Sequence, residues 1–311
     1  MKGNEEITAT ITDELVDERI DVALAKLTGL SRTTISNALI AGQITFDGSP
    51  VAKSFRVQAG QRFLIQIPKN ENEEVKFDYS SQTAKLSIIF EDQDLVVINK
   101  PVGMAAHPSP GWSGATVIGA LAALGIQIST SGADERKGIV HRLDVGTTGL
   151  MVVAKSEIAY SSLKDQFRNR SVSKIYHALV QGHLDPTVGT IDAPIDRHPK
   201  EDYRFAVVTD GKSAITHYRT LEVFPAVTLV EVELETGRTH QIRVHFSALR
   251  HPLVADLIYG ADPTLAAKLE MNRPWLHAKK LGFKHPRTSA AMEYEIEYPQ
   301  DLANCINILA R

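Results

Sequence analysis

The stretch GIVHRLDVGTTGLMVVAKS, residues 138–156, joins a polar loop to a strongly apolar run. His141, Arg142 and Asp144 come first, and the glycines and threonines that follow allow the backbone to turn tightly. The apolar run at residues 149–154 predicts a buried strand. Loops held by a rigid strand often carry catalytic side chains. We therefore expect a functional site immediately before this strand, within an otherwise ordinary globular core.

A second segment, TGRTHQIRVHFSALRH at residues 236–251, contains three arginines and three histidines and no acidic residue. Arg238 and Arg243 are the arginines nearest its start. Such a segment favours binding of a phosphate or a carboxylate, because guanidinium groups form charge-assisted hydrogen bonds with both. From composition alone, a simpler interpretation stays open: Asp144 caps a turn, and the arginines are solvated.

Other familiar chemical motifs are missing from the sequence. Ala206 stands where a phosphate-binding loop ending in Gly211-Lys212-Ser213 would need its first glycine. Neither the G-x-S-x-G elbow of serine hydrolases nor the H-E-x-x-H motif of zinc proteases occurs. The single cysteine, Cys305, cannot form a structural zinc site or an internal disulfide. We therefore expect no metal site.

The composition is that of an ordinary globular protein. Among 311 residues, 43% are hydrophobic and 23% are charged. No apolar run approaches the roughly 18 residues of a membrane span, and the N-terminus is polar and acidic. We expect a cytoplasmic protein with no membrane partner. The net charge of -3 provides no overall attraction to nucleic acid, so any such partner must be bound by local basic patches.

The spacing of apolar residues divides the chain into two parts. The first part predicts two short helices followed by a strand hairpin, and a charged stretch without periodicity follows it. We expect an N-terminal domain at residues 16–75, a linker at 76–85 and a second domain at 86–311. In the second domain strands outnumber helices and rarely alternate with them. This pattern predicts an α+β fold with a mainly antiparallel mixed sheet.

Five blocks of the second domain resemble the RluA/RluD family of RNA pseudouridine synthases, in that family's order. They are HRLDVGTTGLMVVAKS, INKPVGMAAHPSPG, SKIYHALVQGH, PIDRHP and LETGRTHQIRVH. The resemblance covers residues 84–311. The N-terminal stretch RIDVALAKLTGLSRTTISNALIAGQITFDGSPV is similar to the ribosomal-protein-S4-like RNA-binding module that precedes the catalytic domain in some branches of the family.

This resemblance implies that a uridine in RNA is detached at N1, rotated and rejoined through C5, with no cofactor and no metal. Asp144 matches the family's catalytic aspartate. Attack on the base, attack on C1′ and removal of a sugar proton all remain possible roles for it. Tyr176 matches a tyrosine that packs on the target base. Arg243 matches a basic residue that keeps the carboxylate ionised. Arg142 matches an arginine that helps to displace the base from its stack.

The same resemblance implies a set of RNA contacts. In the second domain they are Arg142, His141, Arg238, His240 and Lys100, with a structural contact as the alternative for Arg238 and His240. In the N-terminal module, Lys26, Arg32 and Arg56 would bind phosphates. The first 75 residues hold 8 Lys plus Arg against 11 Asp plus Glu. Affinity there must therefore come from a few placed side chains.

We expect an enzyme of the RluD type that modifies large-subunit (23S) ribosomal RNA, alone or in a pre-ribosomal particle, as a monomer. An RluC-like or transfer-RNA specificity is the alternative within the family. A non-catalytic RNA-binding protein of ribosome assembly is the alternative from another class. A hydrolase would need a second carboxylate near Asp144, and no acid lies between it and Glu157.

Overall fold

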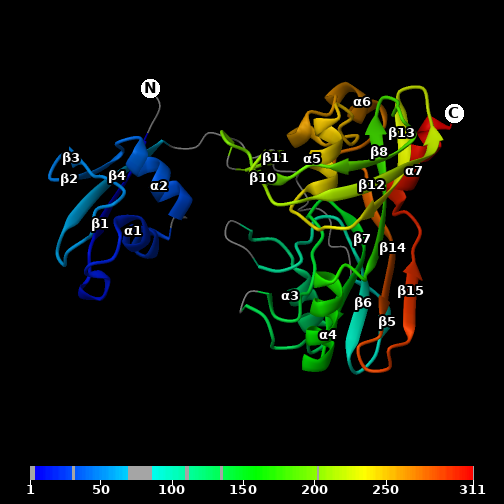
Figure 1. The fold of residues 1–311 in the computed structure, drawn as a ribbon, viewed down its shortest axis with the longest axis horizontal. Helices are drawn as coiled ribbons and strands as arrows, with labels where there is room; N and C mark the ends of the chain where they lie inside the picture. Colours follow the sequence, from blue (N-terminus) through cyan, green and yellow to red (C-terminus); the bar gives the residue numbers. More distant parts are fainter. Residues whose placement is uncertain are drawn as a thin grey trace. The chain divides into compact units, whose positions relative to one another are not determined.

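The computed structural model describes residues 4–29, 32–68, 86–108, 112–133, 136–201 and 203–310 (Figure 1). The chain divides into two compact units, Met1–Lys76 and Phe77–Arg311. The predicted linker at residues 76–85 lies outside the described residues. None of the helices in the described ranges has the length and apolarity that crossing a membrane requires.

The N-terminal unit packs two helices against a small antiparallel sheet. The helices are α1 (Ile20–Thr28) and α2 (Arg32–Ile40), and a single turn, η1 (Asp13–Leu15), precedes them. The strands are β1 (Asn4–Thr10), β2 (Ile44–Phe46), β3 (Ser49–Pro50) and β4 (Arg62–Pro68), in the order β1-β4-β2-β3. The strand β1 pairs with β4 along its whole length. The compact unit therefore begins before residue 16, the predicted start of the domain.

Nine strands form one sheet within the described part of the C-terminal unit. They are β5 (Ser87–Glu91), β6 (Leu95–Lys100), β7 (Thr148–Ala154), β14 (Leu276–Lys284), β8 (Ser173–Gln181), β13 (Val227–Leu234), β12 (Ile215–Val223) and β9 (Val188–Asp192) in spatial order, with β15 (Ala291–Glu295) paired to β14. Only the β7–β14 pair among them is parallel. A separate pair, β10 (Ile195–Arg197) and β11 (Phe205–Val207), is also antiparallel. The predicted α+β, mainly antiparallel fold is confirmed.

The strand β7 lies inside the sheet and is buried on both faces. Its side chains alternate between two apolar clusters, with Met151 and Val153 in one and Leu150 and Val152 in the other. Burial on both sides explains why the run reads as continuously apolar. Gly149 has a φ of +124°, and a Cβ there would lie 2.4 Å from the carbonyl oxygen of Ala278. The close approach of β7 to β14 therefore requires glycine.

Helices cover both faces of this sheet (Figure 1). The helix α4 (Glu157–Arg168) packs on one side of β7, and α3 (Val117–Ala123) and α5 (Gln241–Ala248) pack on the other. Ser156 accepts a hydrogen bond from the Ala159 N–H and thereby caps the start of α4. The turn η3 (Leu257–Tyr259) and the helices α6 (Pro263–Lys268) and α7 (Gln300–Leu309) complete the unit. The strand β7 thus presents the loop before it at a site that α5 also reaches.

Candidate active site

Asp144 lies in the loop before β7, and hydrogen bonds hold its backbone. The Thr147 N–H donates to the carbonyl of Asp144 at 3.0 Å and closes a turn. Arg273, just before β14, donates from Nη1 to the Gly146 carbonyl at 3.1 Å. Its Nε donates to Asp301 on α7 at 2.6 Å. The C-terminal helix therefore braces the loop that carries the candidate carboxylate.

Arg243 projects from α5 and lies between two carboxylates. Its Nε and Nη2 donate to the two oxygens of Asp256 at 2.7 and 2.9 Å. Its Nη1 donates to Oδ2 of Asp144 at 3.4 Å. Asp256 is fully buried, and Arg243 is 6% exposed. The two-point contact with Asp256 fixes the plane of the guanidinium, so one N–H group is directed at Asp144.

His240, the residue before α5, approaches the same oxygen from another side. Its Nε2 lies 3.8 Å from Oδ2 of Asp144, and its Nδ1 lies 2.8 Å from the hydroxyl of Tyr259. The guanidinium of Arg243 lies over the Tyr259 ring, 4.8 Å from its centre. His240 has a φ of +56°, in the left-handed region that non-glycine residues rarely adopt. This strained backbone turns the imidazole toward the carboxylate.

The charges around Asp144 keep it ionised. Burial raises the pKa of Asp144, but His240, Arg243 and Arg142 outweigh burial and hold this pKa below its ordinary value. Burial also lowers the pKa of His240, more strongly than Asp144 raises it. Arg243 is therefore the permanent cation beside Asp144. Burial lowers the pKa of Arg243, and Asp256 and Asp144 reverse this effect, so that the net shift is upward.

Tyr176 forms another wall of the site. It lies on β8, is 8% exposed, and belongs to the main apolar cluster. Burial, and then the charge of Asp144, raises the pKa of its hydroxyl, so Tyr176 stays protonated. A flat ring that is buried and partly accessible from a pocket is suited to packing against a planar base.

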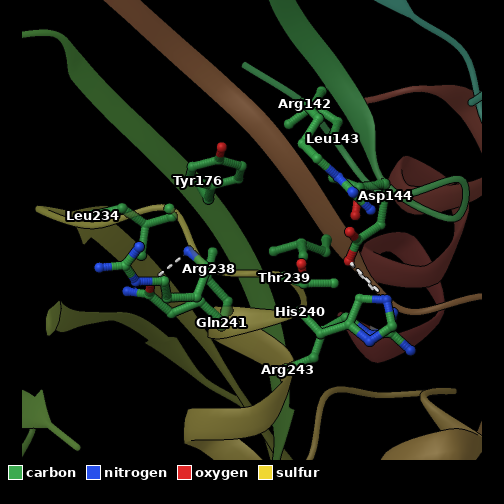
Figure 2. Close-up of a pocket in the computed structure, with 14 residues that line it drawn as sticks. Arg142, Leu143, Asp144, Tyr176, Leu234, Arg238, Thr239, His240, Gln241 and Arg243 are labelled. Atoms are coloured by element: carbon green, nitrogen blue, oxygen red, sulfur yellow. Dashed lines mark hydrogen bonds and ion pairs between the residues drawn. The ribbon is translucent and has the colours of Figure 1, made fainter. Parts of the chain in front are cut away.

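These side chains line one pocket, and they come from three parts of the chain: the loop before β7, the strand β8 and residues 238–243. Arg142, Asp144, Tyr176, Arg238, His240 and Arg243 all face it. Figure 2 shows the carboxylate of Asp144 directed toward Arg243 and His240. Both contacts fall on Oδ2. The pocket thus brings together a carboxylate that is held ionised, a tyrosine ring and exposed guanidinium groups.

A second cavity of about 450 Å³, which we call the flanking groove, opens beside this pocket. Arg142, Tyr176, Leu234, Gly237 and Arg238 line both spaces, so the groove and the pocket share a wall. The groove is otherwise lined mainly by residues of α4, β8 and the loop before Asp144. A ligand that fills the pocket can therefore extend directly into the groove.

Two of the predicted RNA contacts are exposed at these spaces. The side chain of Arg142 is exposed next to Asp144. Arg238 is exposed as well, and its Nε donates to the Ser213 carbonyl at 3.0 Å. Both guanidinium groups remain candidates for RNA binding. His240 instead points its two ring nitrogens at Asp144 and at a tyrosine hydroxyl, which fits the structural alternative.

The structure contradicts the predicted RNA contact of Lys100. This side chain is fully buried, and its Nζ donates to the carbonyls of Pro101 and Met104 at 2.9 and 2.8 Å. Burial lowers the pKa of Lys100 to about 7. Its position at a strand end before proline suggested solvent exposure, but the following loop folds back over it.

His141 lines the flanking groove, as a neutral ring. Burial lowers the pKa of His141 to about 3, and its Nε2 accepts a hydrogen bond from the Val152 N–H.

The N-terminal candidates lie in the other compact unit. Lys26 is exposed on α1, with its Nζ 3.6 Å from Glu18. Arg56 is exposed and donates from Nη1 to the Asp17 carbonyl at 2.5 Å. Arg32 begins α2, and its side chain lies outside what the structure describes. RNA binding by these residues stays a prediction.

Several residues of the site escaped the sequence analysis. Asp256 was the one with a readable signal, since it is an acid inside the apolar stretch HPLVADLIYG. Tyr259 and Arg273 had no such signal, because their roles depend on partners distant in the chain. The helix α5 itself was not assigned either. No cluster of three or more His, Cys, Asp or Glu side chains able to hold a metal ion occurs among the described residues.

Comparisons with known proteins identify the family of this chain. Residues 94–248 match the family model described as RNA pseudouridylate synthase. An uncharacterised RNA pseudouridine synthase of Mycobacterium bovis is 49% identical over 301 residues, covering 96% of each chain. The ribosomal large subunit pseudouridine synthase D of Pseudomonas aeruginosa is 39% identical over 311 residues, covering 97% of this chain and 95% of that protein.

Among solved structures, human RNA pseudouridylate synthase domain containing 1 superposes with a TM-score of 0.57 at 29% identity, covering 71% of this chain and 87% of that one. The fold, the order of the sequence blocks and these relatives all agree. The chain belongs to the RluA/RluD family of RNA pseudouridine synthases.

Proposed function

We propose that this enzyme converts specific uridines of 23S ribosomal RNA to pseudouridine, with Asp144 as the catalytic carboxylate. The observation that carries the catalytic assignment is the contact of Arg243 with the Asp144 carboxylate, which lowers the pKa of that carboxyl, at the pocket shared with Tyr176. The choice of RNA is supported by a relative named for the ribosomal large subunit, which matches this chain over 97% of its length.

The chemistry is an isomerisation, so every atom of the uridine is retained. The bond from N1 to C1′ breaks, the bond from C5 to C1′ forms, C5 loses a proton and N1 gains one. In this proposal the target base leaves its stack and lies against the ring of Tyr176. Arg142, exposed at the mouth of the pocket, occupies the vacated position. Asp144 then reacts at the base or at the sugar.

The electrostatic arrangement suits either reaction of Asp144. Oδ2 carries the contacts with Arg243 and His240. Among the described residues, Oδ1 has no hydrogen bond or ion pair, and we assign it as the reacting oxygen. A carboxylate stabilised through one oxygen stays ionised at neutral pH and keeps the other for the substrate.

The N-terminal unit would contribute RNA affinity from outside the pocket. Lys26 and Arg56 are exposed there, and a bound phosphate would add to the contacts of the catalytic unit. In this proposal the unit resembles the S4-like module in function as well as in sequence. It would raise the affinity for a large RNA and take no part in the isomerisation.

Mapping of pseudouridine in cells with and without this protein tests the proposal. We expect the loss of pseudouridine at defined positions of 23S RNA, restored by the wild-type chain and not by a chain with Asp144→Asn. Purified enzyme should modify the same positions in a 23S transcript. If 23S RNA is unchanged and pseudouridine disappears from transfer RNA, the proposed substrate is wrong.

A further inference from the structure

The flanking groove concentrates positive charge in a chain whose net charge is -3. Its cationic lining consists of Arg136, Arg142, Arg168, Arg170, Lys174 and Arg238. Among the described lining residues, Glu235 is the one carboxylate. It is already engaged, 3.2 Å from Arg170 and 2.8 Å from His217. Arg168 pairs with Asp165 at 2.9 Å. Among the described residues, Arg142, Lys174 and Arg238 form no salt bridge, so these three cations of the groove are available to an anionic ligand.

Among these cations, Lys174 is the one whose position is hardest to explain by a contribution to the stability of the folded protein. It is half-buried on β8. Burial lowers its pKa, and Arg170 lowers it further, against an opposing effect of Glu233. Within the described residues its ammonium group makes no hydrogen bond and no salt bridge. A cation that is partly desolvated and repelled by a neighbour destabilises the free protein, so a ligand is the natural source of compensation.

The register of β8 places Lys174 beside the catalytic pocket. Side chains two residues apart on a strand point to the same face, so Lys174 and Tyr176 share a face and stand about 7 Å apart along β8. Both line the flanking groove, and Tyr176 also lines the pocket. An RNA strand whose target base packs on Tyr176 therefore carries its neighbouring backbone past Lys174.

We propose that Lys174 forms a subsite in the flanking groove for an RNA phosphate adjacent to the target uridine, with Arg142 on the wall shared with the pocket. This proposal rests on the proposed function, because it assigns a contact to the same bound RNA. The ligand is a phosphodiester and not a free base, because the groove offers ammonium and guanidinium donors, which bind phosphate oxygens strongly.

Removing the charge of Lys174 should affect the stability of the free protein and its affinity for RNA in different ways. Lys174→Met keeps much of the aliphatic chain and removes the charge. Because the lost ammonium has no carboxylate contact among the described residues, we expect an unchanged or higher melting temperature. The affinity for RNA should fall about tenfold, as expected when one charge-assisted hydrogen bond is lost. A lysine that only stabilises the fold would show the reverse: lower stability and unchanged affinity.

The test measures binding of the full-length chain to a uridine-containing single-stranded RNA oligonucleotide over a range of salt concentrations. For Lys174→Met we expect weaker binding and a salt dependence reduced by about 0.7 in log–log slope. Lys174→Arg should restore both. Lys164→Met is the matched control, since Lys164 is exposed on α4, contacts the Tyr160 ring and does not line the groove.

Equal affinity and equal salt slope for Lys174→Met and wild type would overturn the subsite. So would a loss of affinity of the same size in the Lys164→Met control. Binding to the oligonucleotide does not depend on which RNA is modified in the cell. An unmodified 23S RNA would therefore refute the proposed substrate and leave this measurement of the subsite intact.

Discussion

Replacing Arg243 by methionine removes the guanidinium that lies between Asp144 and Asp256. Asp256 is affected most, because it is fully buried and loses the two hydrogen bonds that it receives from Arg243. Removing one partner of a buried pair costs about 3–5 kcal/mol. In a unit of this size, that corresponds to a fall in melting temperature of roughly 10 °C.

The same variant changes the pH dependence of the reaction. In the wild type, nearby cations hold the pKa of Asp144 below its ordinary value against the upward effect of burial. Without Arg243 the upward effect of burial on the pKa of Asp144 gains weight, and His240 and Arg142 remain to oppose it among the described residues. Activity that needs ionised Asp144 is lost as pH falls through the pKa of this group. The acid limb of the rate profile should therefore move to higher pH.

A double variant separates the two effects. Arg243→Met combined with Asp256→Leu leaves no unpaired carboxyl at the second position, so most of the lost stability should return. The acid limb should stay displaced, since Asp144 still lacks its cation. Unfolding by heat and urea gives the stability, and single-turnover rates against pH at saturating RNA give the profile. Arg238→Met, a change of the same kind at an exposed arginine, should weaken RNA binding without moving the acid limb.

The result that refutes this reasoning is an acid limb in the double variant that coincides with that of the wild type. In that case Arg243 does not keep Asp144 ionised. An exchange of behaviour between Arg243→Met and Arg238→Met would likewise show that the partner of Asp144 is assigned wrongly. If the double variant is no more stable than the single one, Asp256 is not the source of the destabilisation.

Three other changes test separate parts of the structure. Asp144→Asn should lower isomerisation by roughly a thousandfold or more while RNA binding persists, because the amide keeps the shape and loses the charge; pseudouridine formed at near wild-type rate would exclude Asp144. Removal of residues 1–75 should raise the RNA concentration for half-maximal rate about tenfold, more than it lowers the saturated rate, and an unchanged concentration dependence would exclude a role in RNA binding. Gly149→Ala should cost more than about 3 kcal/mol in urea unfolding, since the new Cβ meets the Ala278 carbonyl; a stable variant would show that β7 and β14 can separate at little cost.

The sequence was informative where one short segment carries the whole signal. The apolar run at residues 149–154 predicted a buried strand, and the polar loop before it predicted the place of the candidate site. The start of α4 is likewise set locally, because Ser156 accepts a hydrogen bond from a backbone N–H only three positions away. The strand β1 was missed because a few apolar residues alternating in a polar N-terminus give a weak signal, and the pairing with β4 that stabilises it spans more than fifty residues.

The sequence alone determined the family, the α+β class and the candidate roles of Asp144, Tyr176 and Arg243, since all of these are read from local blocks. Only the tertiary structure decided which charges meet. It paired Arg243 with Asp256 as well as with Asp144. It buried Lys100 under its own loop and left Lys174 in a groove without a carboxylate contact among the described residues. The partner and the solvation of a charged side chain depend on which distant segments pack around it, and no local pattern of residues records that packing.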